Sequence, residues 1–185
     1  MRHAHLAEVV EKACQAKSNI FGYGIWTHHI LWVVEYGKQL AEILDADADV
    51  VEIAALLHDY ASIKDYKMYE DHHLHGPREA EAILQEYSYP YAMIQAVKEC
   101  IATHRASIQA EQMTKESICL ASADGMAHIA QVPSLLYLAY VQHQMTIDEG
   151  SKWVLEKLQR SWNKLCPEAQ KLIQKDYQSA LNILH

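Results

Sequence analysis

The chain has 185 residues, of which 50% are hydrophobic and 22% charged, an ordinary globular composition with room for one domain and a substantial core. Its formal net charge of −8 argues against a nucleic-acid duplex or an anionic membrane as the main partner. The apolar stretches are too short to cross a bilayer, no signal peptide opens the sequence, and four scattered cysteines form no CxxC pair, so we expect a cytoplasmic protein with reduced thiols.

Apolar residues at helical spacing, together with few Gly and Pro, predict helices along most of the chain. In chain order we expect them at residues 6–17, 25–44, 50–60, 76–87, 90–104, 114–130, 133–145, 148–165 and 168–181. Asp49, the last aspartate of a DADAD break, is expected to cap the helix at 50–60, and residues 62–75 and 105–113 are expected to be irregular. With no strand pattern and no linker, the sequence predicts a single all-α domain over residues 1–185.

The stretch AALLHDYA ends an apolar helical run with His58 and Asp59. Burying an unpaired charge is costly, so this pair needs a partner, either a metal ion or ordinary hydrogen-bonding neighbours. The composition is rich in histidine, with 12 such residues, and seven of them lie between His28 and His104.

Two further side chains are candidates for the same site. At 100° per residue, His29 falls at the edge of the apolar stripe of its helix while His28 points away from it, so His29 is the better ligand candidate. Asp124 lies inside a stretch of small and apolar residues, where Ser122, a backbone donor or a metal would satisfy it. Nitrogen and oxygen ligands together suit Mn, Fe, Co, Ni or Zn.

The order of these residues resembles the H…HD…D signature of the HD-domain superfamily of metal-dependent phosphohydrolases. His29 precedes an apolar run, Ala-Leu-Leu leads into His58-Asp59, and Ala123 precedes Asp124. The resemblance implies an all-α HD-type fold with its metal-site core at about residues 25–130 and a C-terminal helical extension at about 146–185. It also implies that His29, His58, Asp59 and Asp124 hold a metal ion.

Two more segments resemble the longer variants of the superfamily. HHLHGPREAEAIL, residues 72–84, and IATH, residues 101–104, match segments whose histidines help to hold a second metal. Spacing from Gly76 favours His72, with His73 as its competitor, and His104 supplies the other histidine. The resemblance therefore implies one or two divalent ions, with Asp59 as the bridging ligand if there are two.

The chemistry that fits is hydrolysis of a small phosphoester, such as a nucleotide or a related metabolite. His58 and Asp59 would be central to catalysis, because a metal at this site activates water and neutralises charge on a phosphoryl oxygen. Lys64 and Arg105 rank first as substrate-binding cations because they adjoin the His-Asp loop and His104. Two alternatives remain open: an HD-fold di-iron oxygenase with the same ligands, and a sensor that binds a ligand without turnover.

The C-terminal helices, which carry Trp153 and Trp162, match none of these motifs. Three roles are open for them: completing the core, covering the cleft, or pairing two subunits in a homodimer.

Overall fold

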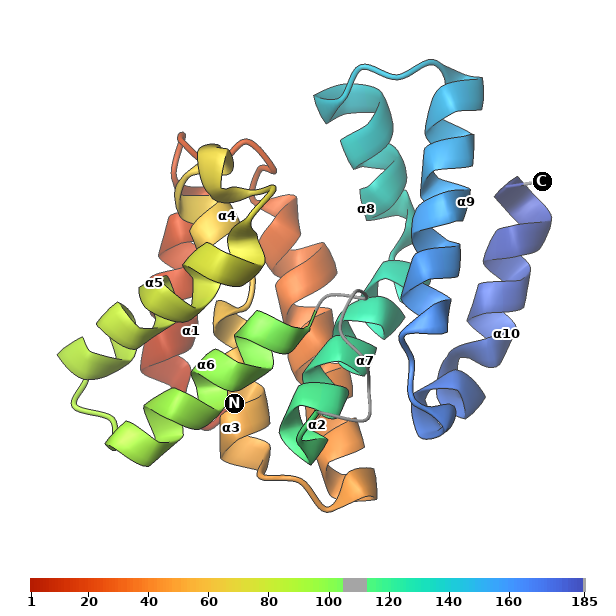
Figure 1. The fold of residues 1–185 in the computed structure, drawn as a ribbon. Helices are drawn as coiled ribbons and strands as arrows, with labels where there is room; N and C mark the ends of the chain where they lie inside the picture. The colour runs from red at the N-terminus through yellow and green to blue at the C-terminus, as the bar shows by residue number, and fades with distance from the viewer. Residues whose placement is uncertain (105–112, 185) are drawn as a thin grey trace.

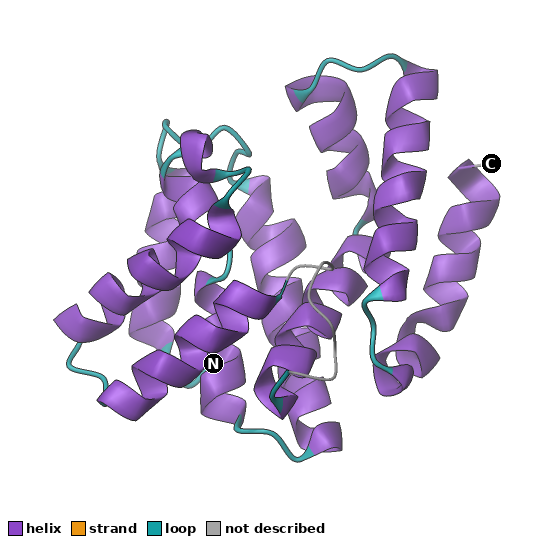
Figure 2. Ribbon diagram, viewed as in Figure 1, coloured by secondary structure: helices purple, strands orange, loops and turns teal. Residues whose placement is uncertain are grey.

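The structure is a computed structural model that describes residues 1–104 and 113–184. Within these residues there is no strand, and the all-α prediction is confirmed (Figures 1 and 2). Ten α-helices follow in chain order: α1 (Ala4–Gln15), α2 (Leu31–Leu44), α3 (Ala48–Leu57), α4 (Tyr60–Lys64), α5 (His72–Glu86), α6 (Tyr91–Thr103), α7 (Lys115–Ala130), α8 (Val132–Tyr137), α9 (Ile147–Asn163) and α10 (Pro167–Leu184). The described residues also include the π-helical η1 (Trp26–Ile30) and η4 (Leu138–Gln142) and the 3-10 turn η2 (Tyr66–Met68).

Three helices, α1, α3 and α5, start two or more residues before the positions that the sequence predicts. Asp47, and not Asp49, caps α3: its carboxylate accepts hydrogen bonds from the backbone N–H groups of Asp49 and Val50, so the helix begins two residues earlier. Helix α5 begins at His72, whereas the sequence predicted an irregular segment up to residue 75. Pro77 therefore lies inside α5, in its second turn, where the missing N–H removes the i→i−4 hydrogen bond to the carbonyl of His73.

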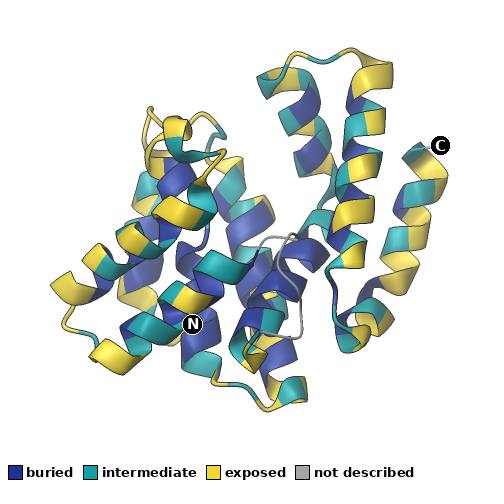
Figure 3. Cartoon of the chain, in the orientation of Figure 1, coloured by how far each residue is buried: buried dark blue, intermediate teal, exposed yellow. Residues whose placement is uncertain are grey.

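Helix α7 is the centre of the fold. It packs against α2, α3 and α6 on one side and against α9 and α10 on the other, as Figure 1 shows. Its residues from Cys119 to Ala127 are all buried, and in Figure 3 the dark blue segments gather around it. Buried side chains from Leu6 in α1 to Ala180 in α10 belong to one hydrophobic cluster. Each buried aliphatic side chain contributes about 1.5–3 kcal/mol.

Helix ends meet near the middle of α7. The C-terminal end of α3, the start of α5, the end of α6 and the turn η1 before α2 all deliver residues to this region. Within the described part of the chain, none of the helices combines the length and the apolar character needed to cross a bilayer. The fold thus joins polar side chains from five elements at the edge of an apolar core.

Candidate metal centre

Two adjacent histidines in the turn η1 point in different directions. His29 is 8% exposed and faces the core, whereas His28 is exposed and its Nδ1 lies 3.1 Å from Oε1 of Gln131. A single π-helical turn is a local irregularity that often accompanies functional sites, and here it sets the direction of both rings. Only His29 joins the cluster of polar side chains described next.

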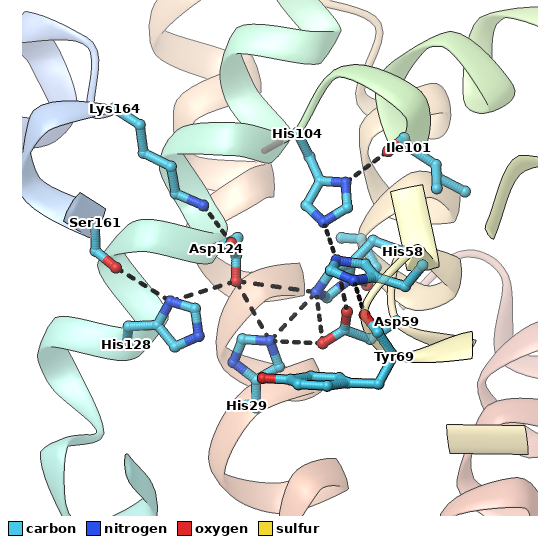
Figure 4. A network of polar contacts seen from close by, with 12 residues as sticks. His29, His58, Asp59, Tyr69, Ile101, His104, Asp124, His128, Ser161 and Lys164 are labelled. Carbon is cyan, nitrogen blue, oxygen red and sulfur yellow. Dashed lines mark hydrogen bonds and ion pairs between the residues drawn. The ribbon is translucent and has the colours of Figure 1, made fainter. Parts of the chain in front are cut away.

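Four side chains form the first group of potential ligands (Figure 4). Nε2 of His29 lies 3.2 Å from Nε2 of His58 and 3.3 Å from Oδ2 of Asp59. The same nitrogen lies 3.4 Å from Oδ1 of Asp124, and Nε2 of His58 lies 3.4 Å from Oδ2 of Asp59. His29, His58 and Asp59 therefore form one set of mutually close ligand atoms, and Asp124 adjoins it through its contact with His29.

A second group shares Asp59 with the first. Nε2 of His72 lies 3.8 Å from Oδ1 of Asp59 and 3.2 Å from Nε2 of His104. The structure brings His72 to this group, whereas His73 is not part of it. One oxygen of Asp59 thus faces each group, which is the arrangement of a carboxylate that bridges two ions.

Three of the histidines are held in the same way. In each, Nδ1 donates a hydrogen bond to the backbone carbonyl three residues earlier: His58 to Ala55 at 2.9 Å, His72 to Tyr69 at 2.7 Å and His104 to Ile101 at 2.6 Å. Because a carbonyl only accepts, Nδ1 carries a proton in each ring, and in a neutral ring Nε2 then keeps its lone pair. Two such lone pairs, 3.2 Å apart in His72 and His104, repel unless a cation lies between them. The donor set therefore fits divalent metal ions.

Positively charged neighbours keep the two carboxylates of the site ionised. Burial by itself raises the pKa of Asp59 and Asp124, but His58 and, for Asp124, Lys164 hold each pKa well below its usual range. Burial lowers the pKa of His58, but the charge of Asp59 acts in the opposite direction, and the net result is a pKa raised to about 9. Burial and the nearby His58 lower the pKa of His104 to about 3, so this ring is neutral. Two ionised carboxylates thus lie in a largely buried cluster.

Two residues of the site were missed by the sequence analysis. Lys164 donates a hydrogen bond to Oδ2 of Asp124, and Nδ1 of His128 lies 3.6 Å from Oδ1 of the same carboxylate. His128 also forms a third potential ligand group with His29 and Asp124. Its position four residues after Asp124 on a helix places both on one face, a signal that the sequence contains. No such local signal exists for Lys164, which lies 40 residues away along the chain.

A cavity of about 1110 Å³ opens onto the two ligand groups. One wall is aromatic: the rings of Tyr66 and Tyr69 stack at 5.4 Å, and Phe21 contacts Tyr69 at 5.5 Å. The opposite wall comes from α9 and includes Lys157 and Arg160. This cavity is large enough for a nucleotide-sized molecule.

Of the two predicted substrate cations, one lies away from the cavity and the other lies outside the described residues. Lys64 is not among the residues that line the cavity, and its ammonium pairs with Oε2 of Glu79 at 2.7 Å. Arg105 lies outside the described residues. Their role in substrate binding stays a prediction.

In a comparison with protein families, the model of the HD domain matches residues 26–128. This segment covers more than half of the chain and contains every ligand candidate from His29 to Asp124. The chain belongs to the HD domain family. Searches for similar curated proteins and for similar solved structures found no match.

Membership in the HD domain family places the chain in a superfamily of metal-dependent hydrolases and confirms the predicted family. The match ends at His128, near the end of α7. Helices α8, α9 and α10 therefore lie outside the matched segment, although α9 forms one wall of the cavity and Lys164, which caps its C-terminus, binds Asp124.

Proposed function

We propose that this HD-domain protein is a metal-dependent phosphohydrolase that acts on a small phosphoester, such as a nucleotide or a related metabolite. The observation that carries the proposal is the position of Asp59, whose two oxygens face separate histidine pairs. Phosphoester hydrolysis is well served by two adjacent divalent ions, because they stabilise both the attacking and the leaving oxygen.

Each ligand group has a role in the proposal. His29, His58 and Asp59, with Asp124 beside His29, would hold one ion, and Asp59, His72 and His104 would hold the second. When bound, the ions would supply a nucleophile at neutral pH by lowering the pKa of water, and would neutralise charge on the phosphoryl group. The nitrogen and oxygen ligands suit Mn, Fe, Co, Ni or Zn.

The protein's own side chains prepare the site for this chemistry. Lys164 binds the outer oxygen of Asp124 and leaves the other oxygen directed toward His29. Burial and the nearby Lys157 hold the pKa of His128 well below its usual value, so this ring adds no positive charge beside His29. The aromatic wall around Tyr69 gives the cavity an apolar side on which a planar group can stack.

The proposal is tested by elemental analysis of the purified protein together with a panel of nucleotides and phosphomonoesters. We expect bound divalent metal and hydrolysis of at least one compound near neutral pH. Asp59→Asn should lower the rate at least about 100-fold, because it removes the shared ligand charge. Glu81→Gln, which changes only the ion pair with Lys98 away from the cavity, is the matched control and should retain the rate.

Three outcomes would contradict the proposal. Bound iron with oxygen uptake and no phosphoester turnover would favour the oxygenase alternative. Tight ligand binding with no turnover of any kind would favour a sensor. Full activity in Asp59→Asn would separate hydrolysis from this cluster.

A further inference from the structure

Helix α9 runs antiparallel to α7, and the two helices lie side by side in Figure 1. Two contacts define their alignment: Lys164 binds Asp124, and one turn earlier on α9 the hydroxyl of Ser161 lies 3.3 Å from Nδ1 of His128. Figure 4 shows both contacts on the same side of the cluster. Moving back along α9 therefore means moving away from the ligand groups in regular steps.

Lys157 lies on the next turn of α9, on the N-terminal side of Ser161. It lies four residues before Ser161 and seven before Lys164, about 10 Å from Lys164 along the helix axis. Its side chain lines the cavity and is half-buried. Arg160 also lines the cavity, and its only ion pair within the described chain is a loose one, 4.0 Å from Oε2 of Glu156. The cavity wall thus carries two cations beyond the one that binds Asp124.

Lys157 differs from Lys164 in having no counter-ion among the described residues. Lys164 is paired directly with Asp124, whereas Lys157 makes no hydrogen bond or ion pair with any residue that the structure describes. Burial lowers the pKa of Lys157, with Asp124 and Asp59 acting in the opposite direction from a distance. A half-buried ammonium without a partner is costly and is stabilised when an anion binds beside it.

We propose that Lys157, assisted by Arg160, binds a second anionic group of the substrate, farther from the metal centre than the phosphoester that is cleaved. This inference rests on the proposed function and narrows its substrate class to phosphoesters with two anionic groups, such as a nucleoside diphosphate or a bisphosphorylated metabolite. The spacing supports a second group because Lys157 lies beyond the level of His128, while Asp124 and Lys164 mark the level of the metal ligands. A volume of about 1110 Å³ also exceeds what a single phosphate fills.

The experiment compares two probes by calorimetric titration of the metal-loaded protein. The probes are inorganic phosphate, with one anionic group, and methylene diphosphonate, which has two and is not hydrolysed. Wild type and all variants are measured at the same total metal concentration, and the metal content is checked after each titration. Chelation of metal by the diphosphonate in solution is then identical for all proteins.

We expect wild type to bind the diphosphonate more tightly than phosphate. Lys157→Met should weaken diphosphonate binding about tenfold, the loss typical of a charged hydrogen bond, and should change phosphate binding less than twofold. Lys157→Arg should retain the preference because it keeps the charge. Lys152→Met is the matched control, since Lys152 is exposed on the same helix and does not line the cavity. Arg160→Gln should give a smaller loss in the same direction.

The proposal is overturned if Lys157→Met binds both probes as wild type does, or if it weakens both equally. The second result would mean that Lys157 contacts the phosphate at the metal centre. The proposed function can fail independently: no turnover of any phosphoester, with the probe preference intact, would reject hydrolysis and leave the anion site standing. Melting temperatures of all variants show whether a loss of binding reflects a loss of fold.

Discussion

Lys164 and Asp124 form a buried ion pair between α9 and α7, with side chains that are 12% and 8% exposed. The lysine binds Oδ2 of the carboxylate, and Oδ1 is left facing His29 at 3.4 Å. Because the HD-domain match ends at residue 128, a helix outside the matched segment supplies the cation that neutralises and orients a ligand candidate inside it. The C-terminal end of α9, where Lys164 follows the helix, is thus part of the site.

Lys164→Met should destabilise the metal-free protein by about 3–5 kcal/mol, because it leaves the buried carboxylate of Asp124 without its partner. Added divalent metal should restore most of this loss, since the ion then balances the same charge. The measurement is the melting temperature of wild type and variant, each with and without metal. We expect the metal-induced increase to be larger in the variant.

Lys115→Met is the control for this change. Lys115 also pairs with an aspartate, Asp45, but both side chains are more than half exposed. Loss of such a surface pair should cost less than about 1 kcal/mol and should not depend on metal. An Lys164→Met protein as stable as wild type without metal would contradict the role assigned to the pair.

Metal stoichiometry should separate the two ligand groups. His104→Ala removes a ligand of the second group only, so we expect it to lower the metal content by one ion. Asp59→Ala removes the ligand that both groups share and should lower the affinity for both ions. Elemental analysis after dialysis measures the ratio of metal to protein. His143→Ala, which changes a cavity histidine outside the ligand groups, should leave the ratio unchanged.

An unchanged metal content in His104→Ala would contradict the second site. It would indicate that the His72 and His104 pair contributes to the fold or to the substrate, and that Asp59 serves one ion.

The helices and the family could be predicted from the sequence because both depend on local order. The helical spacing of apolar residues predicts the helices, and the order of His29, His58, Asp59 and Asp124 along the chain matches the family signature. Helix starts were less predictable where two residues compete for one role. Asp47 and Asp49 are both good caps, and the choice between them depends on which one precedes the first turn.

The cavity wall formed by α9 could not be predicted from the sequence, because residues that are close in space need not be close along the chain. Lys64 follows His58 closely along the chain, yet its side chain pairs with Glu79 and does not line the cavity. Lys157 lies far along the chain, on a helix whose charge pattern is that of an ordinary solvated face. Only the antiparallel packing of α9 on α7 brings it to the site.

Metal binding should release a proton from His58. In the metal-free protein Asp59 raises the pKa of His58 to about 9, against the opposing effect of burial, so near pH 7 the ring carries protons on both nitrogens. A metal ion needs the lone pair of Nε2 and must displace that proton. Metal affinity should therefore fall by about tenfold for each pH unit below 9 through this group.

Calorimetric titration with metal in two buffers of different ionisation enthalpy measures the released protons. We expect about one proton from His58 per ion at the first group near pH 7. A binding enthalpy that is independent of the buffer would mean that His58 is already neutral in the metal-free protein.

Gly125→Ala should loosen the contact between α7 and α9. A Cβ atom at this position would lie 2.7 Å from Cδ2 of Leu165 and 2.9 Å from the backbone oxygen of Ser161. Because the second contact is with backbone, the whole of α9 must shift to relieve it. Overpacking of this kind costs about 1–3 kcal/mol, whereas alanine gains about 1 kcal/mol over glycine in helix propensity. We expect net destabilisation in urea unfolding, together with weaker metal binding, because Lys164 moves with α9.

Gly24→Ala is the control: its Cβ would meet only Cδ2 of His28, at 3.8 Å, so stability should be unchanged. A Gly125→Ala protein as stable as wild type would mean that the two helices can separate without cost, and that the position of Lys164 does not depend on their close approach.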